Sequence, residues 1–77
     1  MEAIEVTAVF DGQGGVTPVS ISRAGRKTPV DCGRSWQDGQ GLHVLVMAPG
    51  ERVLELLFVA AELRWYVRSP GGGGKPA

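Results

Sequence analysis

The sequence predicts an all-β fold, with about six short antiparallel strands in a meander that forms a small barrel or a strongly curled sheet. Apolar residues alternate with polar ones along most of the chain, which is the period of a half-buried strand. Glycine and proline clusters interrupt the pattern, and loops of about two to six residues cannot make parallel crossovers. The 77 residues, 43% of them hydrophobic, suit one small domain. We expect a small β-barrel domain over residues 1–68 and a flexible Gly/Pro-rich tail over residues 69–77.

The first two strands are predicted over residues 3–10 and 17–23. The glycine-rich segment 11–15 between them reads as a chain reversal. In the second strand, Val19 and Ile21 share one face, and Pro18 belongs at a strand start or edge because it has no N–H. In the first strand, the residues on one face are Ile4, Val6, Ala8 and Phe10.

A third strand is predicted over residues 27–36, after a tight turn at Ala24-Gly25. Alternation places Val30, Cys32 and Trp36 on its inward face. Pro29 and Gly33 within this segment indicate an edge strand or a β-bulge.

Three further strands are predicted over residues 42–48, 52–59 and 63–68. The first is almost continuously apolar, as in a strand covered on both faces or at a barrel seam. Pro49-Gly50 matches a type II turn. A helix within residues 51–67 and a two-layer sandwich remain alternatives, since the same apolar pattern serves both. The barrel is expected to enclose Phe10, Ile21, Val30, Leu54, Phe58 and Trp65.

Catalytic, metal and cofactor sites are not expected. Cys32 is the one cysteine, so the chain has no internal disulfide, zinc ribbon or CxxC pair, and its thiol is expected to be buried and inert. His43 is the one histidine and a poor metal ligand without a second. Glu55 is expected to face solvent or to pair with a cross-strand arginine such as Arg64. The glycine-rich tail lacks the Ser or Thr and the helix of a phosphate loop.

One local charge asymmetry stands out in a chain of net charge zero. Residues 23–36 carry four basic side chains and one acidic side chain, whereas residues 1–22 carry three acidic side chains and no lysine or arginine. Such a patch suits an acidic partner, or the phosphates of a single strand with Trp36 as a stacking aromatic. The candidate contact residues are Arg23, Arg26, Lys27 and Arg34.

The succession of "VFD", a glycine turn, "TPVSI", "AGRK", "HVLVM", "ERVLEL" and "RWYV" resembles a small bacterial all-β domain family of uncharacterised function, over roughly residues 4–68. Ser22, Ala24 and Cys32 depart from the pattern of that family. Some of its members occur near genes for translesion DNA polymerases, which implies a nucleic-acid context. The family offers no catalytic residues to carry over.

These observations predict a cytoplasmic, non-enzymatic accessory or protein-interaction module without a cofactor. The start "MEAIEV" does not read as a secretory signal, and no apolar run is long enough to cross a membrane. An unknown protein is the expected partner. The alternative is a weak single-stranded nucleic-acid-binding barrel that uses the basic hairpin at residues 23–34. Homo-oligomerisation through an exposed edge strand or through "HVLVMA" is a third option.

Overall fold

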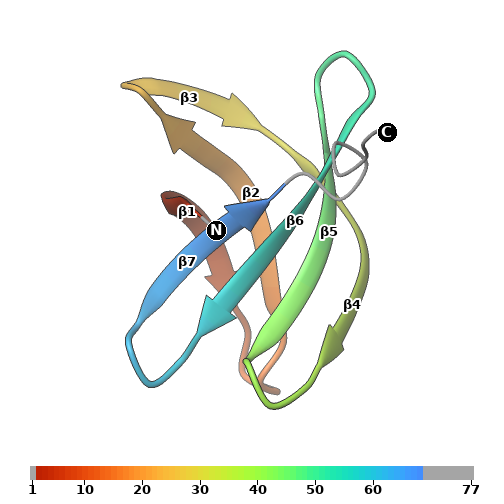
Figure 1. Ribbon diagram of the computed structural model, residues 1–77. Coiled ribbons are helices and arrows are strands. Elements are labelled where there is room, and N and C mark those ends of the chain that lie inside the picture. Colours follow the sequence, from red (N-terminus) through yellow and green to blue (C-terminus); the bar gives the residue numbers. More distant parts are fainter. Residues whose placement is uncertain (1, 69–77) are drawn as a thin grey trace, which may run out of the picture.

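The protein forms one curled antiparallel sheet of seven strands, and this computed structural model describes residues 2–68 (Figure 1). The all-β prediction is confirmed, and the alternative helix within residues 51–67 is wrong, since that segment forms strands and a turn. The expected tail lies outside the described residues. The strands are β1 Glu2–Phe10, β2 Val16–Arg23, β3 Arg26–Pro29, β4 Asp31–Gln37, β5 Leu42–Ala48, β6 Arg52–Val59 and β7 Arg64–Arg68.

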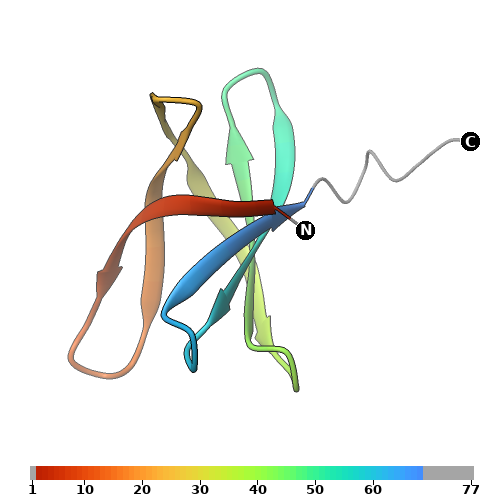
Figure 2. The same cartoon turned by 60° about the vertical axis from the view of Figure 1, so that its left-hand side comes forward.

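The strand order is β3-β2-β1-β7-β6-β5-β4. All the pairs in this order are antiparallel, and the sheet curls into a half-barrel rather than splitting into two layers (Figure 2). Among the strands of residues 2–68, only β1 and β7 pair without being consecutive in the chain; Ile4 lies opposite Trp65. The predicted meander is therefore present, with its first and last strands joined in the middle of the sheet.

The third predicted strand is two strands that meet at Val30. β3 pairs with β2, whereas β4 pairs with β5 at the other end of the sheet. The Val30 N–H still donates to the Val19 carbonyl at 3.1 Å, and the next residue, Asp31, already lies opposite Met47. Val30 is buried at the point where the pairing partner changes from β2 to β5. One continuous segment thus forms both ends of the sheet order.

The concave face of the sheet carries the core. Of the six residues expected inside, Ile21, Val30, Leu54 and Trp65 are buried, and Phe58 is partly buried against them. Phe10 is 59% exposed, so its prediction as an enclosed residue is wrong. It is the last residue of β1, and its ring makes only an edge contact with Phe58, at 5.8 Å between centroids. The other buried core residues are Val44, Val46, Ala48, Leu56 and Val67.

A β-bulge in β2 explains why the alternation of apolar and polar residues predicts the wrong face for Val19. Thr7 lies opposite Ser20 and Ala8 opposite Pro18, so Val19 has no partner in β1. The extra residue reverses the alternation between the two halves of the strand. Val19, expected on the inward face, is 41% exposed.

A second bulge, in β4, moves Trp36 off the face on which it was predicted, whereas Cys32 lies before the bulge, opposite the core residue Val46. The register shifts between Cys32 and Ser35, which confirms the bulge indicated by Gly33. After it, Ser35 lies opposite the core residue Val44, and Trp36 lies opposite His43 on the convex face. Trp36 is therefore outside the core.

Cys32 is exposed rather than buried, and its Sγ donates to the Pro18 carbonyl at 3.0 Å. Partial burial of the sulfur, and then the charge of Asp31, raise the pKa of the thiol. The thiolate is the reactive form of cysteine, and a raised pKa disfavours it.

Candidate functional site

The β2–β3 hairpin holds two arginines on the concave face of the sheet. Its turn is Ala24-Gly25, with φ values of 52° and 78°, as in the left-handed turns that match the twist of a hairpin. Arg23 therefore lies directly opposite Arg26. Both share a face with the buried Ile21, two residues before Arg23.

The β5–β6 hairpin supplies a third arginine from the other side of the half-barrel. Its tip contains Pro49 and Gly50, and Gly50 has a φ of 85°, as its predicted turn position requires. Arg52 follows the tip, opposite Ala48, and Leu54 continues the same face into the core.

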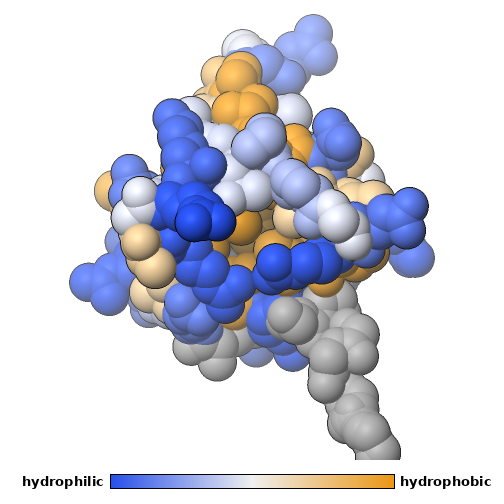
Figure 3. Space-filling view, turned by 90° about the horizontal axis from the view of Figure 1, so that it is seen from above, coloured by the Kyte–Doolittle hydropathy of each residue, from blue (hydrophilic) through white to orange (hydrophobic). Residues whose placement is uncertain are grey.

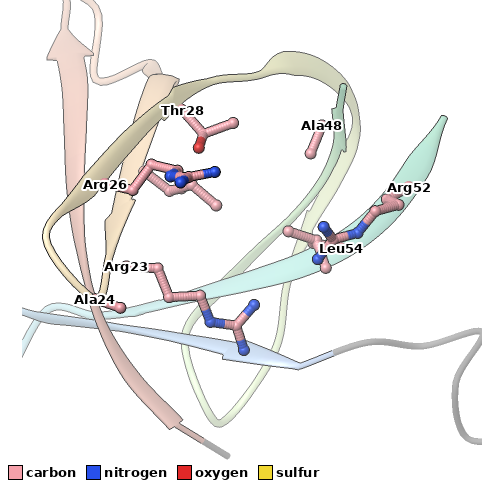
Figure 4. Close-up of a pocket in the computed structure, with 8 residues that line it drawn as sticks. Arg23, Ala24, Arg26, Thr28, Ala48, Arg52 and Leu54 are labelled. Carbon is pink, nitrogen blue, oxygen red and sulfur yellow. The ribbon is translucent and has the colours of Figure 1, made fainter. Parts of the chain in front are cut away.

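The two hairpins enclose a pocket of about 360 Å³, which we call the arginine mouth. In Figure 4, Arg26 and Arg52 extend into the opening from opposite sides, and Arg23 lies below Arg26 in that view. Seen from above, this end of the molecule is hollowed, and hydrophobic surface lies between hydrophilic side chains (Figure 3). Its lining residues are Ile21, Arg23, Ala24, Arg26, Thr28, Ala48, Arg52 and Leu54.

The arginine mouth is lined by three arginines, and no carboxylate from the described residues 2–68 lines it. Arg23 is held from outside by Glu2, with Nη2 at 2.8 Å from Oε1. This hydrogen bond raises the pKa of Arg23 and lowers that of Glu2. Within residues 2–68, neither Arg26 nor Arg52 has an ion-pair partner. Two guanidinium groups are thus available to an anion above an apolar floor.

The structure separates the four candidate residues predicted from the sequence. Arg23 and Arg26 line the arginine mouth, but Lys27, one position along the strand, does not. Arg34 lies on β4 with its guanidinium carbon 5.8 Å from the centre of the Trp36 ring. Trp36 itself stacks on His43, with ring centroids 5.0 Å apart and planes 2° apart.

Sequence reasoning missed Arg52 because it looked for basic residues clustered along the chain. Arg52 lies 26 positions after Arg26 and reaches the same pocket only because β3 and β6 lie on opposite sides of the opening. The available signal was its position directly after a Pro-Gly hairpin tip, next to the inward residue Leu54.

A buried ionic network lies on the convex face of the sheet. It joins His43 and Glu55, for which the sequence predicted no contact with each other. His43 Nδ1 lies 2.6 Å from Glu55 Oε2, and both side chains are at most 5% exposed. Arg68 donates to Glu55 from the neighbouring strand, with Nε at 3.1 Å from Oε1. Glu55 therefore has a cross-strand arginine, as one alternative held, but the partner is Arg68 rather than Arg64.

The other side of the His43 ring faces the β4–β5 loop. Nε2 lies 2.9 Å from Asp38 Oδ2, an ion-pair distance without the direction of a hydrogen bond. Burial lowers the pKa of His43, but Glu55 and Asp38 raise it by more, so its net shift is upward. Burial likewise raises the pKa of Glu55, and the hydrogen bonds from His43 and Arg68 lower it by more. This network ties the loop to the sheet.

His43 lies at the centre of this network and is enclosed on the convex face. Among residues 2–68, no three His, Cys, Asp or Glu side chains are grouped to hold a metal ion. The imidazole is covered by Trp36 and is 2% exposed, and it lines none of the four pockets described for this part of the chain. Its ring is thus enclosed by Trp36, Glu55 and Asp38.

Comparisons with known proteins identify no relative. No protein family model, no curated protein sequence and no solved structure matches the chain. The resemblance to a bacterial domain family stays a prediction. No helix in the part of the chain that the structure describes is long and apolar enough to span a membrane.

Proposed function

We propose that this protein is a non-enzymatic, cytoplasmic interaction module that binds an acidic segment of a partner protein in the arginine mouth. The observation that carries the proposal is the meeting of Arg23, Arg26 and Arg52 around an apolar floor, with no carboxylate in the lining. Charge-assisted hydrogen bonds from guanidinium to carboxylate are short, directional and often bidentate, so this site suits glutamate and aspartate side chains.

The apolar floor favours a polypeptide over a nucleic-acid strand. Ile21 and Leu54 offer contact to the methylene groups of an acidic side chain or to a neighbouring apolar residue. A single-stranded nucleic acid binds through phosphates together with bases stacked on exposed aromatic rings. No aromatic residue lines the arginine mouth, and Trp36 has one ring face on His43.

Titration calorimetry with hexaglutamate, hexalysine and a single-stranded oligothymidylate tests the proposal. We expect hexaglutamate to bind and its affinity to fall as salt is raised. Arg26→Ala or Arg52→Ala should weaken binding about tenfold or more, because a hydrogen bond to a charged group contributes roughly 1.5–3 kcal/mol. Arg34→Ala is the matched control, since it removes the same charge away from the mouth, and should change the affinity less than threefold.

Two results would overturn the proposal. Equal losses from Arg26→Ala, Arg52→Ala and Arg34→Ala would show a diffuse charge effect without a site. Binding of the oligothymidylate with no binding of hexaglutamate would favour the nucleic-acid alternative instead.

A further inference from the structure

The edge of β3 borders the arginine mouth. β3 is the last strand of the sheet order and, within residues 2–68, pairs with β2 alone, over all four of its residues. The side chains of Arg26 and Thr28 line the mouth, and across the opening lie Ala48 and Arg52 of the β5–β6 hairpin. The unpaired edge and the charged pocket therefore belong to one surface.

The backbone of β3 offers hydrogen-bonding groups toward this opening. The Val30 N–H donates to Val19 in β2, and strand geometry alternates the direction of the backbone groups from residue to residue. Thr28 and Arg26 therefore point their backbone groups toward β2, whereas Lys27 and Pro29 point theirs away. Pro29 has no N–H, so Lys27 is the residue of β3 that presents both a free donor and a free acceptor.

An extended segment paired with this edge would place its side chains in register with the site. Side chains of adjacent strands alternate together between the two faces of a sheet. Every second side chain of an added strand would therefore lie on the concave face beside Arg26 and Thr28, within the space that Arg52 reaches from the other hairpin. Acidic residues at alternate positions would match these charges.

We propose that the partner segment adds to the sheet as a further strand along β3, with glutamate or aspartate at every second position directed into the arginine mouth. This inference rests on the proposed function and names how the acidic segment is held. Pairing through backbone hydrogen bonds gives affinity, and alternate side-chain pockets give specificity. A second copy of this chain is a poorer occupant of the edge, because β3 against β3 would bring Arg26 and Lys27 of both copies together.

The test uses the chain with the capped peptide Glu-Thr-Glu-Thr-Glu-Thr and two derivatives of it. One derivative is N-methylated at its glutamates and the other at its threonines, so each lacks the N–H groups along one edge. Strand addition requires that one derivative lose at least tenfold in affinity while the other binds within threefold of the parent peptide. Equal affinities of both derivatives would overturn the inference and leave the proposed function standing.

Substitution of Lys27 gives a second, independent reading. Lys27→Pro removes the outward N–H at an edge position where proline is tolerated, and Lys27→Ala removes the same charge but keeps the N–H. We expect Lys27→Pro to weaken binding at least tenfold more than Lys27→Ala. Similar affinities for the two variants would contradict strand addition, whereas failure of the parent peptide and of hexaglutamate to bind at all would reject the proposed function itself. Light scattering at rising concentration reports self-association, which would assign the edge to a second copy.

Discussion

The free energy of unfolding should fall as the pH rises above neutrality, because the convex-face network of His43, Glu55, Asp38 and Arg68 raises the pKa of His43 and so favours its charged form. The groups that face His43 are Glu55 and Asp38, with Arg68 on the far side of Glu55 and Trp36 against the ring. The pKa of His43 in the folded protein is raised above its ordinary value of 6.5. A group with a raised folded pKa adds stability that is complete below its unfolded pKa and is lost as pH rises through the folded pKa.

The slope of the free energy of unfolding against pH is limited by the number of groups that titrate. His43 is the one histidine of the chain, so the stability curve should lose at most about 1.4 kcal/mol per pH unit from this source, the value for one proton. The pKa of Glu55 is lowered, which adds a second limb: its contribution is present above the unfolded carboxyl pKa and is lost on acidification through the folded value. Stability should therefore be greatest at about pH 5–6.5.

Urea denaturation at half-unit steps between pH 4 and pH 8 measures this curve, and the imidazole resonances of the one histidine report its folded pKa by NMR. His43→Gln should remove the alkaline limb and cost about 3 kcal/mol at pH 6, because it leaves Glu55 buried with Arg68 alone. Should that variant not fold, Asp38→Asn should shift the His43 titration to lower pH. A wild-type stability that rises from pH 6 to pH 8, or a His43 pKa below 6.5, would refute the reasoning.

Three further stability predictions concern packing and turns, each measured by chemical denaturation with circular dichroism. Leu56 is completely buried, and Leu56→Ala should cost about 2–5 kcal/mol, whereas a loss below 1 kcal/mol would contradict its place in the core. At Gly41, an added Cβ would fall 2.3 Å from the carbonyl oxygen of Phe58, so Gly41→Ala should destabilise the fold strongly, and near-wild-type stability would place this backbone elsewhere. In the β2–β3 turn, Gly25→Ala should cost about 1 kcal/mol and Ala24→Gly should be neutral or slightly stabilising, because both positions have positive φ. The opposite order of these two variants would argue against the turn.

Alternation along the chain was sufficient to predict the other strands, but it read β3 and β4 as one, because the alternation does not show that the pairing partner changes at Val30. It failed where a bulge inserted one residue: Val19 and Trp36 both lie beyond such a point, and both lie away from the predicted face. Gly33 indicated the bulge in β4. The sequence does not show, however, at which residue of the bulge the inward and outward faces exchange.

The candidate site was predictable only in part, for a related reason. Arg23 and Arg26 flank one turn, so local sequence brings them together. Arg52 joins them through the curl of the whole sheet, and His43 meets Glu55 across two strands. Such meetings depend on register and curvature, which a single sequence does not display.

The pairing of β1 with β7 has a consequence for how fast the protein folds. The other neighbours in the sheet are consecutive hairpins, whereas Ile4 and Trp65 are separated by 61 positions (65 minus 4). The entropic free energy of closing a loop of that length is about 2 kcal/mol greater than that of closing a five-residue hairpin loop. Folding should therefore wait on this single long-range contact. The hairpins can form early, but none of them acquires its full concave core until the first strand finds the last.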